Sequence, residues 1–185
     1  MQVVENLNEK LSFKNPVVTI GSFDGVHLGH RQIFKYLKKK ATQLDGDSIV
    51  ITFDPHPQEF LRFGTDFFIL NSLKEKIELI REENPDYLII LPFTYQLASL
   101  PFTQFFEDYL KEKIGIKALI MGPNHSFGKN REANIESVSE LCEKEDIEIV
   151  IVPELVIDGQ PVRSQRIRNM IRNLEIDKAS KLLGR

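Results

Sequence analysis

Short apolar runs alternate with longer amphipathic segments along most of the chain, and this alternation predicts an α/β fold with a parallel sheet. Two of the runs, 86–91 and 117–121, are apolar at almost every position. Uniformly apolar strands are typical of a parallel sheet that is covered on both faces. We therefore expect an open, Rossmann-like sheet of about five strands, at residues 16–21, 48–53, 86–91, 117–121 and 147–152.

The amphipathic segments predict helices on both faces of this sheet. One start is clearly marked, because Ser72-Leu73-Lys74-Glu75 has the pattern of a capping box. We expect these helices near residues 29–43, 72–83, 103–113 and 135–144.

The pattern changes after residue 152. Apolar residues flank Asp158-Gly159, which is a strong signal for a β-hairpin between residues 154–157 and 160–162. Two further helices are expected, at 164–173 and 177–183. Neither an internal repeat nor a low-complexity segment interrupts the pattern, so we expect one domain over residues 1–185.

Composition narrows the classes of protein. Of the 185 residues, 42% are hydrophobic, which is enough for a packed core, and the net charge of −3 argues against a nucleic-acid partner. Cys142 is the only cysteine, so an intrachain disulfide and a multi-cysteine zinc site are excluded. The first ten residues are polar, and no apolar run reaches membrane-spanning length. We therefore expect a cytoplasmic protein without a membrane partner.

The segment Gly21–His30, GSFDGVHLGH, places glycines and two histidines where the first of these strands ends and a helix begins. A helix N-terminus carries unpaired N–H groups and about half a positive charge, which favours phosphate. His27 and His30 are three residues apart, so they would face the same way and could donate to phosphate oxygens. This histidine motif predicts a nucleotide-phosphate site. A surface histidine pair or half of a metal site is the alternative.

Four arginines lie close together near residue 168 although the chain is acidic: Arg163, Arg166, Arg168 and Arg172. The planar guanidinium makes paired, charge-assisted hydrogen bonds with phosphate. Ser164 stands at the expected N-cap of the helix, where its oxygen could bind a backbone N–H or a ligand. Arg166 and Arg168 are two residues apart and cannot share one helical face. The segment fits a phosphate site or the exposed basic face of a helix.

Two other loops carry polar and aromatic groups. Residues 52–57, TFDPHP, form a loop stiffened by two prolines, which could hold an aromatic edge and a histidine against a flat ligand or could be a plain rigid turn. In residues 121–131, Asn124 offers amide groups, Phe127 a ring, and Gly128 close backbone approach, although this stretch could also be a mobile surface loop.

All these loops follow a strand or the hairpin. Ligands of open parallel sheets bind at the carboxyl ends of the strands, near the switch in strand order. We therefore expect the histidine motif, residues 52–57, residues 121–131 and residues 163–168 to converge on one crevice.

The H-x-G-H pair together with the later S-x-R-I-R stretch resembles the nucleotidyltransferase superfamily, which has a Rossmann-like HIGH-type fold. Pantetheine-phosphate, nicotinamide-mononucleotide and glycerol-phosphate nucleotidyltransferases share H-x-G-H. With TFDPHP and the GxNxxFGKxR loop added, residues 16–185 resemble the adenylyltransferase module of bacterial FAD synthetases. The family pattern S-S-T-R-I-R is matched here except at Arg163 and Gln165, and His125 replaces the usual aromatic residue.

The resemblance implies the reaction FMN + ATP → FAD + pyrophosphate, with the FMN phosphate attacking the α-phosphorus of ATP in line. A phosphate monoester has a second pKa near roughly 6, so the nucleophile is ionised at neutral pH and needs no general base. Mg²⁺ would arrive with ATP and be carried mainly by phosphate oxygens.

The resemblance also implies roles for individual residues. The catalytic residues would be His27, His30, Asn124, Ser164, Arg166 and Arg168. ATP would be bound by Gly21, Ser22, Phe23, His27, Gly29, His30, Arg131, Ser164 and Arg168. FMN would be bound by Phe53, Asp54, His56, Pro57, Asn124 and Phe127. No residue is assigned to a metal.

Members of this family usually carry a second module, a riboflavin kinase β-barrel, which would begin near residue 185. Residues 1–185 would then hold the adenylyltransferase module alone, either as a natural single-module protein or as part of a longer one, with a separate riboflavin kinase as a candidate partner. Two alternatives stay open. The chain could transfer a nucleotide to another phosphate substrate, or it could be a flavin-nucleotide-binding module with feeble catalysis.

Overall fold

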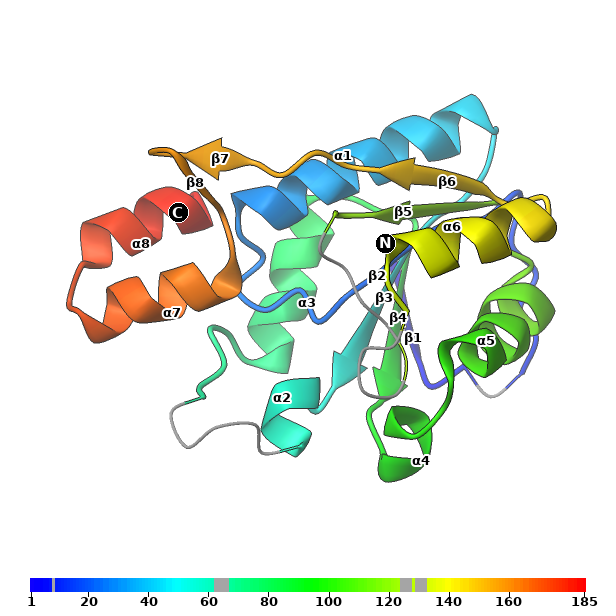
Figure 1. The fold of residues 1–185 in the computed structure, drawn as a ribbon, viewed down its shortest axis with the longest axis horizontal. Coiled ribbons are helices and arrows are strands. Elements are labelled where there is room, and N and C mark those ends of the chain that lie inside the picture. Colours follow the sequence, from blue (N-terminus) through cyan, green and yellow to red (C-terminus); the bar gives the residue numbers. More distant parts are fainter. Residues whose placement is uncertain (8, 62–66, 124–127, 129–132) are drawn as a thin grey trace.

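A six-stranded parallel sheet forms the centre of the molecule (Figure 1). The computed structural model describes residues 1–7, 9–61, 67–123, 128 and 133–185. Within these residues the strand order is β1-β4-β3-β2-β5-β6. The strands are β1 (Gln2–Glu5), β2 (Val17–Ile20), β3 (Ser48–Asp54), β4 (Tyr87–Pro92), β5 (Ala118–Met121) and β6 (Glu148–Ile151).

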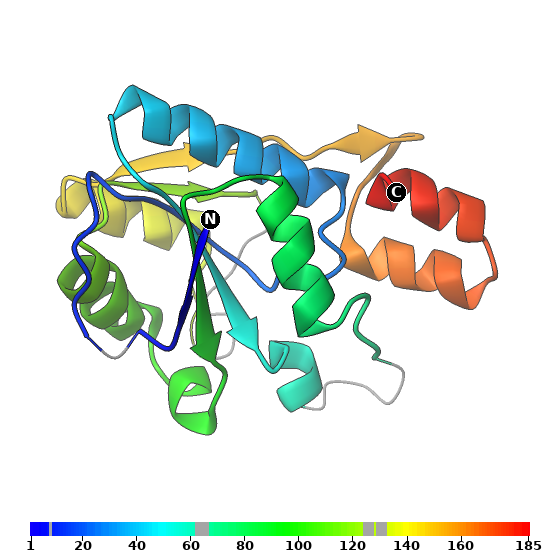
Figure 2. The ribbon, with the colours of Figure 1, turned by 180° about the vertical axis from the view of Figure 1, so that it is seen from behind.

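Helices cover both faces of the sheet (Figure 2). One face packs against α1 (Leu28–Gln43) and α3 (Leu73–Glu82). The other packs against α6 (Ile135–Lys144) and against α5 (Phe102–Phe105), which continues as the π-helix η1 (Phe106–Ile114). Two single-turn helices, α2 (Pro57–Phe60) and α4 (Tyr95–Ala98), follow β3 and β4.

Successive residues of a strand belong to two separate cores, because side chains alternate between the two faces of a sheet. In β2, for example, Val17 packs with Phe34 and Leu37 of α1, whereas Val18 packs with Phe106 and Val138 on the opposite side. Burial on both faces explains why the central strands are mostly apolar.

A small unit of helices and a hairpin follows the sheet. It consists of β7 (Val156–Ile157), β8 (Gln160–Pro161), α7 (Ser164–Arg172) and α8 (Ile176–Leu183). Its own core is small: Val162, Ile167, Ala179 and Leu182 are buried together. Both views place α8 beside the start of α1 (Figures 1 and 2).

The strand order places the histidine motif at the switch point of the sheet. From β2 the chain steps through α1 to β3 and β4 on one side, and it later returns to β5 on the other side of β2. The loop after β2 therefore opens into the crevice where ligands of such sheets bind.

The sequence pattern predicted most of this fold. The five expected strands, the hairpin and the capping box at Ser72 are confirmed, and the expected helix at 103–113 is the α5–η1 segment. The estimate of about five strands missed β1, which pairs with β4 at the sheet edge. This strand has four residues, two of them exposed, so it lacks the apolar run by which the others were found.

No helix in the described part of the chain is long and apolar enough to span a membrane.

Leu37 tests the core between α1 and the sheet. Its side chain is fully buried, so Leu37→Ala should lower the free energy of unfolding by about 2–5 kcal/mol, measured by urea denaturation followed by circular dichroism. Lys39→Ala on the exposed side of α1 is the control and should change it by less than about 0.5 kcal/mol. Equal effects of the two substitutions would contradict this account of the core.

Candidate active site

The two histidines of the histidine motif lie against each other at the start of α1. His27 is the N-cap of the helix, and its Nδ1 accepts a hydrogen bond of 3.2 Å from the backbone N–H of His30. The two imidazoles are stacked, with centroids 3.6 Å apart and planes 15° apart. The expectation that both face the same way is confirmed.

His27 is held as a neutral imidazole with a defined tautomer. The side chain is buried, and burial lowers its pKa to about 4, with a smaller contribution from the positive charges of Arg168 and Arg185. Because Nδ1 accepts a hydrogen bond, the ring proton resides on Nε2. His27 can therefore donate one hydrogen bond to a ligand without carrying a charge.

The turn that leads to His27 has an unusual backbone. Three residues in four take positive φ angles: Phe23 at 46°, Gly25 at 84° and Val26 at 38°. A positive φ is strained for a β-branched residue such as Val26. Backbone strain of this kind concentrates at functional sites. The ring of Phe23 is buried against His30 and Phe34, which helps to fix the turn.

Asp24, in the middle of this turn, forms a buried ion pair with Arg168 of α7. Its other carboxylate oxygen accepts a hydrogen bond of 2.9 Å from the backbone N–H of Leu70. Burial raises the pKa of Asp24, although the Leu70 bond and the charge of Arg168 oppose the shift. Arg168 also donates to the carbonyl of Phe68 at 2.7 Å, and its guanidinium lies 4.4 Å from the ring centroid of Phe67.

Ser164 adds a second bond between α7 and the same turn. Its hydroxyl donates to the carbonyl oxygen of Asp24 at 2.9 Å. The prediction that Ser164 is the N-cap was wrong, because the extended backbone of Arg163 takes that position and Ser164 is the first helical residue. Gly29 lets the segment before α7 come close to α1, because a Cβ at residue 29 would lie 3.2 Å from the carbonyl oxygen of Val162.

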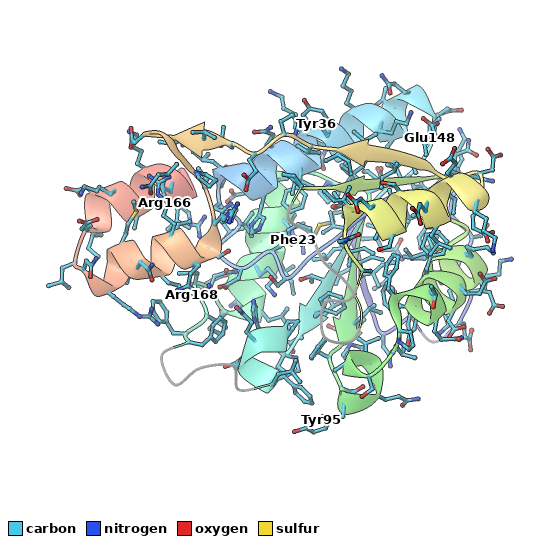
Figure 3. The ribbon with its side chains drawn as sticks, in the orientation of Figure 1. Phe23, Tyr36, Tyr95, Glu148, Arg166 and Arg168 are labelled. Carbon is cyan, nitrogen blue, oxygen red and sulfur yellow. The ribbon has the colours of Figure 1, made fainter. Side chains whose placement is uncertain are left out.

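The remaining polar residues of the arginine segment point away from Asp24. Arg166 leaves α7 on a different side from Arg168 (Figure 3), and its Nη1 donates to the carbonyl oxygens of Ile157 and Gln160 in the hairpin. Arg163 pairs with Glu154, and Gln165 bonds to Asn169 one turn on. Arg166 thus fixes the hairpin on α7, and its expected contact with phosphate stays a prediction.

The TFDPHP segment lies beside the histidine motif. The hydroxyl of Thr52 donates to the carbonyl of Ser22 at 3.2 Å. The N–H of Gly21 donates to the carbonyl of Ile51, which continues the pairing of β2 with β3 by one residue. Asp54 is exposed at the end of β3, and the Asp54–Pro55 peptide bond is cis.

His56 resembles His27 in its local structure. It is the N-cap of α2, it precedes Pro57 at the first helical position, and its Nδ1 accepts from the N–H of Gln58. Burial, with the nearby charges of Lys76 and Arg168, lowers its pKa to about 3, so it too is neutral.

A chain of contacts runs from His56 to the buried ion pair. The ring of Phe67 lies 4.9 Å from that of His56 and also under Arg168. Lys76 of α3 is buried below this region, and its Nζ lies 3.4 Å from the carbonyl oxygen of Phe53. The histidine motif, residues 52–57 and α7 therefore meet at one end of the sheet, as expected.

Four aromatic side chains, called the aromatic group below, gather at the carboxyl ends of β3 and β4. Phe93 contacts Phe53 at 5.7 Å and Phe60 at 5.5 Å between ring centroids, and Phe60 contacts Tyr95 at 4.7 Å. Tyr95 is 73% exposed, so one side of this group faces solvent. Of the four, sequence reasoning singled out only Phe53.

Three predicted site residues, Asn124, Phe127 and Arg131, lie outside the described residues. Sequence reasoning missed Asp24 although it quoted the segment that contains it. The signal available was that Asp24 is the only acid among the ten residues of the motif. Lys76 and Arg185 carried no comparable signal, because Lys76 lies on a helix rich in ordinary charged residues and Arg185 follows another such helix.

Comparison with known proteins identifies the family of the chain. The family model of FAD synthetase matches residues 9–166. The chain belongs to the FAD synthetase family. Its relatives include the bifunctional riboflavin kinase/FMN adenylyltransferases of Buchnera aphidicola from Acyrthosiphon pisum, 31% identical, and of Pseudomonas fluorescens, 30% identical. Both alignments span all of this chain but only 59% and 60% of the relatives' own lengths.

Solved structures give the same picture of the fold. A crystal structure described as a macrolide-efflux protein from Streptococcus pneumoniae has a TM-score of 0.86 and 28% identity, covering 98% of this chain and 60% of that one. A pantoate-beta-alanine ligase from Francisella tularensis has a TM-score of 0.53 at 15% identity, covering 98% of this chain and 86% of its own. The latter shows likeness of fold alone.

Removing the charge of Asp24 tests the buried ion pair of this FAD synthetase-family site. Asp24→Asn keeps an acceptor for the Leu70 N–H but leaves the Arg168 charge buried without its partner. We expect the free energy of unfolding to fall by about 3–5 kcal/mol, measured by urea denaturation. In the control Asp158→Asn, which removes the exposed pair with Lys181, the loss should stay below about 1 kcal/mol. Similar losses would mean that the buried pair does not stabilise the fold as described.

The low pKa of His56 predicts acid destabilisation. Between pH 6.5 and 4 the unfolded chain binds a proton at this residue and the folded chain does not, so stability falls as the pH falls. His56→Asn keeps an acceptor at the N-cap and cannot titrate. Between pH 7 and pH 5, the free energy of unfolding of His56→Asn should fall by about 2 kcal/mol less than that of the parent chain. Identical losses in the two proteins would show that His56 is not held neutral.

Proposed function

We propose that the chain is an FMN adenylyltransferase, which transfers AMP from ATP to the phosphate of FMN and releases pyrophosphate. The observation that carries the proposal is the junction of the histidine motif with α7 through Asp24, Ser164 and Arg168. It brings the two most distant signature segments of the FAD synthetase family to one end of the sheet. Family membership and the names of the relatives support the same activity.

The geometry of the two histidines suits stabilisation of phosphate rather than proton transfer. His27 is neutral and can donate through Nε2, and the N-terminus of α1 adds a positive dipole end beside it. The FMN phosphate needs no base, since it is ionised at neutral pH. Catalysis then depends on holding the two phosphates in line and on stabilising charge at the transferred and leaving groups.

Ser164 and Arg168 act in this proposal mainly by fixing the position of α7. Arg168 uses Nε and Nη2 on protein acceptors, so its contribution to phosphate binding is chiefly the positive charge that it brings near the motif. Alanine at residue 168 is therefore a poor probe of activity, because it would also leave Asp24 buried without its partner.

The aromatic group supports the flavin half of the reaction. A flat isoalloxazine ring is recognised by stacking on aromatic side chains, and Phe53, Phe60, Phe93 and Tyr95 form a partly exposed aromatic surface near His56 at the ends of β3 and β4. We expect Mg²⁺ to enter bound to ATP, because it keeps several waters and few protein ligands.

We extend the proposal to the source of FMN. The relatives are bifunctional, and this chain aligns with about three fifths of their length. We therefore infer that a riboflavin kinase activity supplies the FMN. A cytoplasmic setting fits ATP as substrate and the single buried cysteine.

His30→Ala tests the reaction. The parent chain, given FMN, ATP and Mg²⁺, should form FAD and pyrophosphate, separated by chromatography and followed by a coupled pyrophosphate assay. His30→Ala should lower turnover by more than about tenfold, because removal of one preorganised donor costs about 10²–10³. Lys39→Ala, at the far end of the same helix, should keep parental turnover.

Other outcomes of that assay separate the alternatives. Tight ATP or FMN binding without pyrophosphate release would indicate a binding module. Turnover of nicotinamide mononucleotide or phosphopantetheine instead of FMN would indicate another nucleotidyltransferase. Either result would overturn the proposal.

A further inference from the structure

Two distant side chains hold the backbone of Gly25, two residues before His27. The N–H of Gly25 donates to Oδ1 of Asn71 at 2.5 Å. On the other side of the residue, Nη2 of Arg185 donates to the Gly25 carbonyl oxygen at 3.0 Å. Gly25 is buried with a φ of 84°, so these two bonds fix a backbone conformation that few other residues could adopt.

The segment that carries Arg185 also packs on both sides of His27. A Cβ on Gly25 would lie 3.3 Å from Cδ2 of Leu183, and a Cβ on Gly184 would lie 2.6 Å from Cδ2 of Leu28. Gly184, with a φ of 73°, ends α8 and turns the chain toward the motif. Residues 183–185 therefore contact Gly25 before His27 and Leu28 after it, in agreement with the position of α8 beside the start of α1 (Figure 2).

The charge of Arg185 reaches the same histidine. Among the described residues, the positive charges of Arg168 and Arg185 lower the pKa of His27, one from α7 and one from the segment after α8. The match to the FAD synthetase family model ends at residue 166, so Arg185 lies beyond the part of the chain that the model describes.

We propose that Arg185 is a positioning residue of the active site, which acts by binding the Gly25 carbonyl and so holds the turn that aims His27 and His30. The proposal rests on the proposed function for the identity of the ligand, a nucleotide triphosphate. Arg185 does not need to touch the substrate, because its hydrogen bond fixes the backbone from which the stacked histidines project.

The kinetic experiment compares Arg185→Gln, Arg185→Lys and a control in the full chain. The control is Lys178→Gln, which removes a positive charge from α8 at an exposed pair with Glu175, away from the motif. Arg185→Gln should lower kcat for FAD formation by about tenfold with little change in KM for FMN, because a misplaced donor weakens transition-state stabilisation. Arg185→Lys, which can still donate to the carbonyl, should recover most of the loss, and Lys178→Gln should match the parent.

Thermal unfolding of the same variants excludes a general loss of structure. Arg185 is exposed, so all three substitutions should leave the midpoint close to that of the parent. Parental kcat in Arg185→Gln, or an equal loss in Lys178→Gln, would overturn the proposal.

A titration of His27 by nuclear magnetic resonance gives a readout that does not need turnover. Loss of the neighbouring positive charge should raise the pKa of His27 in Arg185→Gln and leave it unchanged in Lys178→Gln. If the parent chain makes no FAD, the proposed function fails while this titration still tests the contact. If it makes FAD but the pKa of His27 does not move in Arg185→Gln, the positioning role fails.

Discussion

The buried ion pair between Asp24 and Arg168 is the interaction on which the arrangement of the site depends. It joins the loop after β2 to α7, which are 144 residues apart in the chain. A buried pair stabilises only when further hydrogen bonds offset the loss of hydration. Here those bonds come from the N–H of Leu70 and the carbonyl of Phe68, so a third segment of the chain is drawn into the same cluster.

That cluster also explains how the strained turn persists. A backbone with positive φ at Phe23 and Val26 would relax if it were held only by its neighbours. Instead Asn71, Ser164 and Arg185 bind its polar backbone groups, and the ring of Phe23 is packed below it. The histidines therefore project from a turn whose shape is set by distant parts of the fold.

The sequence predicted features that depend on neighbouring residues, and it missed features that depend on contacts between distant parts of the chain. Elements with a local signal were found: apolar strands, the capping box at Ser72 and the hairpin turn at Asp158-Gly159. That His27 and His30 face the same way was expected from their spacing, whereas the stacking of their rings is visible only in the structure. Strand β1 was missed because it is short and half exposed, and its pairing with β4 is visible only in three dimensions.

Within the site, the sequence indicated which segments would take part but not what each residue would do. The arginine segment was recognised, but whether Arg166 or Arg168 meets the motif depends on where α7 begins. The helix starts at Ser164, one residue earlier than an N-cap at that position would give. Asp24 was missed because its partner Arg168 is 144 residues away in the chain and is visible only once the chain has folded.

The small core of the α7–α8 unit has a consequence for the order of folding. The two large cores involve residues up to 152, whereas the partners of the turn lie at 164, 168 and 185. During synthesis the sheet can form before these residues have left the ribosome, so the site is completed last. In the described part of the chain the unit's own core holds four buried residues, so its attachment to the sheet depends on the contacts among Asp24, Ser164 and Arg168. The geometry of the candidate site therefore depends on how this unit is attached, as well as on the folding of the sheet.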